Sequence, residues 1–263
     1  MHRRDYGPRR GRRRRLPLAP LAVALLAFAM AFALPPEEET QPQSAPVVSL
    51  SALADSDAQQ ASRGVEPDIP ETGAVDKDSW NLLLVNPWNP LPEDYTFTLK
   101  ELSNGHAVDE RCYPDLQAMM DACRADGLSP LICSSYRSQE KQGSLFQNKV
   151  ERLISQGMSR EDAKVEAGKT VAVPGTSEHQ LGLAVDIVDI NNQNLDSSQE
   201  STAVQQWLIA HSWEYGFILR YPNDKSELTG IIYEPWHYRY VGKDAAKEIH
   251  ETGVCLEEYL GVS

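Results

Sequence analysis

Two short stretches of the chain concentrate the residue types that bind metal ions and move protons. His179 and Asp186 lie in the first stretch, and His237 follows Glu234 by three residues in the second. Imidazole nitrogens and carboxylate oxygens are both good zinc ligands, and a catalytic zinc takes three protein ligands with one position left for water. His179, Asp186 and His237 would supply such a set, with Glu234 as a nearby carboxylate that takes a proton from the activated water. A set of this kind would suit metal-assisted hydrolysis.

Asp186 is the member of this set whose surroundings most need an explanation. It stands in an apolar run, with Ala184 and Val185 before it and Ile187 and Val188 after it. A carboxylate in an apolar strand is costly unless a cation or a metal neutralises it. An arginine partner would satisfy Asp186 as well as zinc does, so the spacing of the residues leaves both readings open.

The elements that must position these residues follow from the spacing of apolar side chains. Helical spacing, with Pro, Ser or Gly at several of the ends, predicts helices at 114–125, 138–156, from 159 to the loop at 173–175, and around 204–211 and 245–249. Short β-like runs predict strands at 131–134, 184–188, 217–220, 231–233 and 238–241. Because helices come early and strands cluster late, the sequence favours an α+β domain with a small, mainly antiparallel sheet flanked by helices.

The N-terminal part of the chain divides into three segments of unlike composition. Residues 1–15 contain eight Arg and one Asp, and residues 16–34 contain no charged side chain. A positive segment before an apolar one keeps the N-terminus in the cytoplasm, and 16–34 can just cross a hydrocarbon core of roughly 30 Å. We predict a transmembrane anchor or a cleaved signal peptide at 16–34. Residues 35–78, rich in Pro, Glu, Gln and Ser, are predicted to be a disordered linker.

The remaining residues, 79–263, are predicted to form a single catalytic domain of ordinary size. The chain carries a net charge of -13, and eight of its 25 basic residues lie in the first 15 positions, so the rest is more acidic than the total implies. Such a body argues against binding nucleic acid, whose affinity comes mainly from Lys and Arg contacts to phosphates. The four cysteines permit two disulfides in an exported domain, with three possible pairings.

Six segments of the domain carry distinctive motifs. Four surround the residues above: SSYRSQEKQ at 134–142, PGTSEHQLGLAVDI at 174–187, WLIAHSWEYGFILRYP at 207–222 and EPWHYRYVG at 234–242. The other two open and close the domain, as LLLVNPWNPLPEDY at 82–95 and CLEEYL at 255–260. In order and spacing these segments resemble the VanY-type zinc D-alanyl-D-alanine carboxypeptidases. The resemblance spans the domain from about residue 80 and implies a fold of the Hedgehog/DD-peptidase type.

The resemblance also implies roles for individual residues. His179, Asp186 and His237 match the ligands of one zinc ion, and Glu234 matches the catalytic base. Arg137 matches the arginine that faces the substrate and stabilises charge at the scissile carbonyl. The predicted reaction is hydrolysis of an amide bond by water, without a serine nucleophile.

The substrate implied by the resemblance is the stem peptide of bacterial peptidoglycan or its precursor, which would lose its terminal D-Ala. Gln142 and Ser177 match positions that commonly contact the end of that peptide. A tether at 16–34 would hold the domain outside the bacterial cell membrane, or release it if the signal is cleaved. An L,D-carboxypeptidase, a D,D-dipeptidase and a non-catalytic zinc-containing module that binds the wall stay open as alternatives, although Glu234 argues against the last.

Overall fold

The computed structural model describes residues 75–262 of the chain. The predicted basic segment at 1–15, the anchor or signal peptide at 16–34 and most of the predicted linker lie outside the described residues. Within 75–262, none of the helices combines the length and the apolar character that a membrane span requires.

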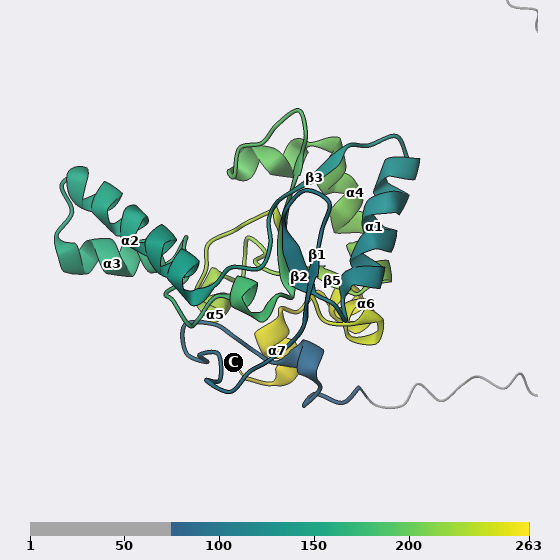
Figure 1. The fold of residues 1–263 in the computed structure, drawn as a ribbon, viewed down its shortest axis with the longest axis horizontal. Coiled ribbons are helices and arrows are strands. Elements are labelled where there is room, and N and C mark those ends of the chain that lie inside the picture. The colour runs from purple at the N-terminus through teal and green to yellow at the C-terminus, as the bar shows by residue number, and fades with distance from the viewer. Residues whose placement is uncertain (1–74, 263) are drawn as a thin grey trace, which may run out of the picture. The chain divides into compact units, whose positions relative to one another are not determined.

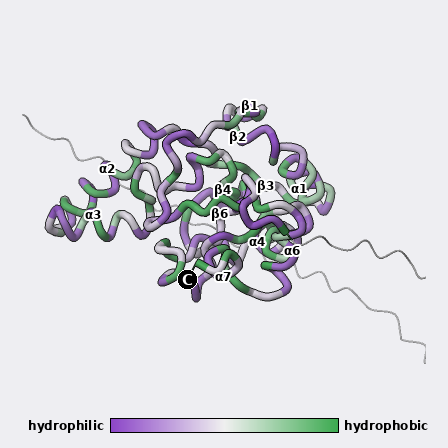
Figure 2. Tube along the Cα trace, turned by 90° about the horizontal axis from the view of Figure 1, so that it is seen from below, coloured by the Kyte–Doolittle hydropathy of each residue, from purple (hydrophilic) through white to green (hydrophobic). Residues whose placement is uncertain are grey.

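A four-stranded sheet forms the middle of the described domain (Figure 1). Its strands run in the order β3 (Pro130–Ser134), β4 (Ala184–Asp189), β6 (His237–Tyr240) and β5 (Phe217–Leu219), and each is antiparallel to its neighbours. Strand β4 belongs to the hydrophobic segments in Figure 2, and both β4 and β6 are almost entirely buried. The predicted small antiparallel sheet is confirmed. A separate two-stranded ladder, β1 (Leu99–Glu101) with β2 (Ala107–Asp109), has no counterpart in the prediction.

Three helices contact the sheet. Helix α1 (Tyr113–Ala125) contacts β3, α4 (Ala203–His211) contacts β4, and α6 (Lys243–Thr252) contacts β5. The remaining helices are α2 (Gln139–Ser155), α3 (Arg160–Gly168), α5 (Ser226–Thr229) and α7 (Leu256–Leu260), and the 3₁₀ turns are η1 (Trp80–Leu82), η2 (Glu178–Leu181), η3 (Ser197–Ser201) and η4 (Ser212–Tyr215). The five predicted helices are therefore present, with ends that differ by a few residues.

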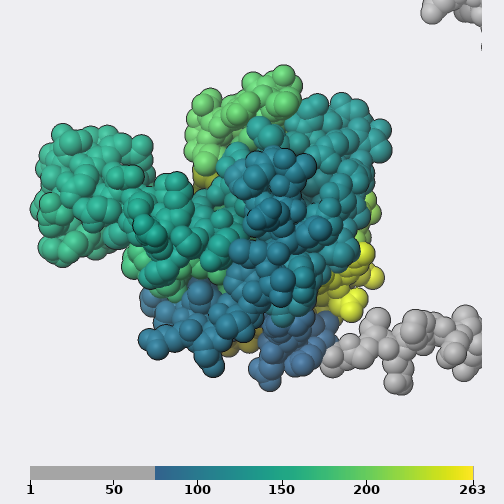
Figure 3. Space-filling view, viewed as in Figure 1, coloured from purple at the N-terminus to yellow at the C-terminus, as the bar shows by residue number. Residues whose placement is uncertain are grey.

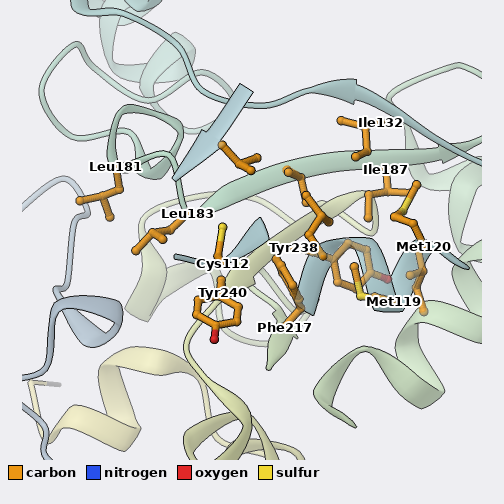
Figure 4. Packing of buried hydrophobic residues seen from close by; sticks show 14 of the residues in the cluster. Cys112, Met119, Met120, Ile132, Leu181, Leu183, Ile187, Phe217, Tyr238 and Tyr240 are labelled. Carbon is orange, nitrogen blue, oxygen red and sulfur yellow. The ribbon is translucent and has the colours of Figure 1, made fainter. Parts of the chain in front are cut away.

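The main hydrophobic core lies between the sheet and α1, as Figure 4 shows. The inward face of α1 consists of the four residues that its helical spacing predicts, Leu116, Met119, Met120 and Cys123. Met119 and Met120 belong to the same buried cluster as Ile187 of β4. Each large apolar side chain buried in this way contributes about 1.5–3 kcal/mol to stability, so the core fixes the strand that carries Asp186.

Helices α2 and α3 form a hairpin that stands out from the sheet (Figure 1). Ser138 and Ser159 cap the two helices, each accepting a hydrogen bond from the backbone amide three residues further on, at 3.2 and 3.1 Å. The hairpin has a small core of its own, made of Val150, Leu153, Ala163 and Ala167. Because these side chains pack α2 against α3, the two helices form one packed unit beside the sheet.

The predicted strand at 231–233 is wrong. The Ile232 amide donates to the Lys169 carbonyl at 2.9 Å, and the Glu234 amide donates to the Tyr221 carbonyl at 3.2 Å. The segment thus forms hydrogen bonds to two different neighbours, whereas a strand would pair with one neighbour along its length. The segment is apolar for another reason, since Ile231 is buried outside the sheet.

The four cysteines are all free thiols in the structure: Cys112, Cys123, Cys133 and Cys255. Burial raises the pKa of Cys133 to about 12, with Asp186 adding to the effect. Thiols of this kind are poor nucleophiles, so these cysteines act as packing residues.

Gly182 joins η2 to the strand that holds Asp186. Its φ is +73°, and a Cβ there would lie 2.5 Å from the Phe97 ring and 3.0 Å from the Asp109 amide nitrogen. We expect Gly182→Ala to lower the free energy of unfolding by about 2–5 kcal/mol, since a left-handed backbone costs about 1–2 kcal/mol and overpacking about 1–3 kcal/mol. Gly127→Ala is the matched control, because φ there is +80° but no atom lies within 4 Å. If denaturant unfolding showed that the two variants lose equal free energy of unfolding, the steric contribution at Gly182 would be contradicted.

Candidate metal centre and catalytic site

The three predicted metal ligands come together at one end of the central sheet. His179 lies in η2, and Asp186 of β4 is paired directly with His237 of β6 in the ladder. One donor atom from each residue lies within 4.8 Å of the others, and all three residues are buried. Antiparallel register therefore positions two of the ligands, and the turn before β4 adds the third.

Hydrogen bonds orient both imidazoles. His179 Nδ1 lies 2.8 Å from the Ser135 carbonyl, so Nδ1 donates, and Nε2 is left facing Asp186 Oδ2 at 3.3 Å. His237 is turned the other way, with Nδ1 3.1 Å from Asp186 Oδ1 and Nε2 3.4 Å from Glu178 Oε2. Each histidine thus presents one nitrogen to the Asp186 carboxylate and holds the other against a group behind it, as metal-binding histidines do.

Two buried atoms without hydrogen-bond partners indicate that this cluster fits a metal. Among the described residues, His237 Nε2 and Glu178 Oε2 are the buried side-chain polar atoms that have no hydrogen-bond partner. A metal on His237 Nδ1 would fix the ring proton on Nε2, where Glu178 Oε2 can accept it. The donor set and this unmatched pair both suit zinc.

The protonation states of the cluster agree with this reading. Burial, aided by Arg137, lowers the pKa of His179 to about 4. Burial alone would raise the pKa of Asp186, but His179 and His237 hold it well below its usual value. Burial alone would lower the pKa of His237, but the neighbouring carboxylates of Asp186 and Glu178 raise it to about 9. Without a metal, the cluster consists of the Asp186 carboxylate between a neutral His179 ring and a protonated His237 ring. A metal bound to His237 would displace the proton of that ring.

Glu178 belongs to a network of fully buried charges behind the cluster. Its Oε1 accepts from Arg220 Nε at 2.7 Å and from Arg239 Nη1 at 2.9 Å. Burial alone would raise the pKa of Glu178, but the two arginines hold it well below its usual value. Arg220 also donates two hydrogen bonds to Glu257 of α7, at 2.9 and 2.6 Å. The sequence motifs contain these residues, but pattern alone gives them no role.

The network extends to the segment before β1. Arg239 donates to the carbonyl oxygens of Asn81 and Leu83, each at 3.0 Å. The side-chain amide of Asn86 donates from Nδ2 to Glu257 Oε1 at 3.0 Å. The first and last parts of the described domain are therefore bonded to the charges that orient His237.

Arg137 reaches the cluster from the loop before α2. Its guanidinium donates to Asp186 Oδ2 at 2.9 Å and to the Ser134 hydroxyl at 2.8 Å. Asp186 thus has the arginine partner that its apolar setting allowed, and the two histidines lie beside it. Gln142 lies behind Arg137, accepting from it at 3.3 Å and donating to the Ala172 carbonyl at 2.7 Å. Arg137 lines the cavity described below, whereas Gln142 does not.

Glu234 lies beside the three donors without being one of them. Its Oε2 is 3.8 Å from His237 Nδ1. Burial raises the pKa of Glu234 to about 8 against the opposing effects of His237 and Arg137, and a bound cation would bring that pKa down. A carboxyl group with a pKa near neutrality, close to the cluster, has the properties of a general acid and base.

A cavity of about 1170 Å³ opens onto the cluster. Arg137, Ser177 and Glu234 all line it, and so does Tyr221, whose ring centroid lies 4.7 Å from that of His237. The cavity continues between α2 on one side and the segments around 195–197 and 231–233 on the other. Figure 3 shows the hairpin standing apart from the light-green segment near residue 200, with a hollow between them.

A buried His, Asp and His cluster with a free glutamate and an arginine on one cavity wall is the arrangement of a metal-dependent hydrolase. The chain matches the family model VanY, D-alanyl-D-alanine carboxypeptidase, over residues 105–243. It is 50% identical over 185 residues to a D-alanyl-D-alanine carboxypeptidase of Enterococcus faecalis, covering 70% of this chain and 67% of the relative. The chain belongs to the VanY family.

Two solved structures of VanY proteins are similar to the domain. One is a vancomycin resistance D,D-pentapeptidase VanY in complex with Zn(II), with 49% identity and a TM-score of 0.64 over 69% of this chain and 99% of that one. The other is VanYB in complex with D-alanine-D-alanine, with 49% identity and a TM-score of 0.65 over 70% and 99%. The predicted family and its fold type are confirmed.

Proposed function

We propose that this protein is a zinc-dependent D,D-carboxypeptidase that removes the terminal D-Ala from peptidoglycan stem peptides or their precursors. The observation that carries the proposal is the buried cluster of His179, Asp186 and His237, with Glu234 and Arg137 on the wall of the same cavity. The Zn(II) and D-alanine-D-alanine bound by its VanY relatives support both the metal and the substrate class.

The roles of the residues follow from their places around the cavity. Zinc, when bound by the cluster, would polarise the scissile carbonyl and lower the pKa of water to about 7. Glu234 takes the proton from the attacking water and hands it to the leaving amine. Arg137, held beside Asp186, stabilises the negative charge that develops on the carbonyl oxygen. Ser177 lines the cavity and is a candidate contact for the end of the peptide. Gln142 accepts a hydrogen bond from Arg137 and helps to orient it.

We also propose that residues 79–263 act as one catalytic domain outside the cell membrane. The apolar stretch 16–34, preceded by eight arginines, would attach the protein to the membrane or direct its secretion. Residues 35–78 would then serve as the linker that lets the domain reach the cell wall.

The proposal is tested by incubating the purified protein with a pentapeptide stem ending in D-Ala-D-Ala and with the tetrapeptide stem, and identifying the products by mass. We expect D-Ala from the pentapeptide, loss of the reaction with a chelator, and its recovery with added Zn²⁺. Release of D-Ala from the tetrapeptide alone would indicate an L,D-carboxypeptidase, and release of the intact D-Ala-D-Ala a dipeptidase. No product from either substrate with zinc present would contradict catalysis.

A further inference from the structure

The cavity continues along one face of α2, away from the metal cluster. The residues of α2 that line it are Leu145, Asn148, Lys149 and Arg152. Their spacing of three, one and three residues places them on the same side of a helix. The cavity volume of about 1170 Å³ exceeds the roughly 300–1,000 Å³ that encloses a drug-sized ligand. The site therefore has room for more of a substrate than its last two residues.

Two cations on this wall have no ion-pair partner among the described residues. Within residues 75–262, the side chains of Lys149 and Arg152 make neither an ion pair nor a hydrogen bond. Three other cations of the same hairpin, Arg160, Lys164 and Lys169, each form an ion pair with a glutamate at 2.9–3.1 Å. Lys141, near the other end of α2, also has no ion-pair partner among the described residues but does not line the cavity, so Lys149 and Arg152 are the unpaired cations of this hairpin that face it.

The surroundings of Lys149 show that the pair is unfavourable without a ligand. Burial and the neighbouring Arg152 both lower the pKa of Lys149. Glu166 and Glu234 act in the opposite direction, but Glu166 is already paired with Lys169 at 2.9 Å and Glu234 makes no ion pair with Lys149. Arg152 lies in the last turn of α2, where a cation also suits the helix dipole, but Lys149 precedes that turn. An anion between the two would relieve their repulsion.

The position of Lys149 along α2 indicates which part of a substrate it would meet. Gln142, which accepts a hydrogen bond from Arg137, precedes Lys149 by seven residues on the helix. That separation is about 10 Å at 1.5 Å per helical residue. An extended peptide covers the same distance in about three residues.

We infer that Lys149 and Arg152 form a carboxylate-binding subsite for the part of the stem peptide that precedes the scissile bond. The inference rests on the proposed function, because it assumes that the stem peptide lies in this cavity. Stem peptides supply the required chemistry in two ways: as the free α-carboxylate of a γ-linked D-glutamate at the second position, or as the side-chain carboxylate of meso-diaminopimelate at the third. The spacing of about three residues favours the glutamate.

The test compares kcat/KM for four pentapeptide stems with the full-length protein. The stems combine D-glutamate or its neutral amide, D-isoglutamine, at position two with L-lysine or meso-diaminopimelate at position three. We expect the wild type to prefer the D-glutamate stems about 2- to 5-fold, the range of a partly exposed charge pair. The double variant Lys149→Gln/Arg152→Gln should reduce that ratio to near one. A preference for meso-diaminopimelate that disappears in the double variant would support the subsite and assign its ligand to position three.

The control variant is Lys164→Gln, which removes an exposed cation from the same hairpin and should keep the wild-type ratio. Thermal unfolding checks that each variant is folded. A diacyl-L-Lys-D-Ala-D-Ala substrate, which lacks position two, separates the two hypotheses in the wild type. Hydrolysis of it with no preference for either carboxylate among the four stems would overturn the subsite alone. Failure to hydrolyse any of these substrates would overturn the proposed function.

Discussion

Glu234→Gln is expected to lower kcat by about 10²- to 10⁴-fold while the protein keeps its zinc. Glutamine has the size of glutamate but cannot accept a proton at neutral pH. Glu234 is close to the metal ligands without belonging to them, since its nearest oxygen lies 3.8 Å from His237 Nδ1. Turnover is measured as D-Ala release and metal content by elemental analysis of the purified variant.

The matched control is Glu227→Gln, at an exposed glutamate of α5 that does not line the cavity. That variant should keep both zinc and the wild-type kcat. Two results for Glu234→Gln would count against its role as base. Turnover within a few-fold of wild type would show that another group moves the proton, and loss of zinc would show that Glu234 is itself a ligand.

Glu178→Gln is expected to have the largest effect on stability. The substitution removes the negative charge that Arg220 and Arg239 share, and it leaves both buried guanidinium groups under-compensated. Removing one partner of a buried ion pair costs about 3–5 kcal/mol. The same change weakens the support of His237 from behind, and such losses lower metal affinity by about 10- to 100-fold.

Denaturant unfolding gives the first quantity and competition with a zinc-binding dye gives the second. Glu161→Gln is the control, because Glu161 forms an exposed ion pair with Lys164 that contributes about 0–1 kcal/mol. Glu178→Asp adds a second test, since it keeps the charge but shortens the side chain, and should retain more zinc affinity than Glu178→Gln. If Glu178→Gln were as stable as the control variant, the buried network would not be a source of stability.

The sequence was sufficient to predict the longer helices and the three residues that meet in the His, Asp and His cluster. Helix α1 is an example, because Leu116, Met119, Met120 and Cys123 follow one another at helical spacing and all four are buried. Asp186 is another, since its apolar neighbours require a cation or metal beside it. Both signals are local, and therefore readable along the chain.

The charges behind the metal cluster could not be predicted in this way. Glu178 meets Arg220 and Arg239 only because η2 and two neighbouring strands of the sheet bring distant segments together. An isolated glutamate or arginine in the sequence is most often a surface residue. Short elements escaped for a different reason, since the five residues of α7 are too few to show a helical period. The apolar run at 231–233 misled because burial outside the sheet and burial in a strand give the same pattern.

The bonds from Arg220 to α7 and from Arg239 to the segment before β1 connect the support of His237 to the two ends of the described domain. A chain synthesised from its N-terminus presents His179, Asp186 and His237 before Glu257 has emerged. Until α7 docks, Arg220 lacks its bidentate partner and the support behind His237 is incomplete. We therefore expect the protein to bind zinc at full affinity only after α7 has joined the domain.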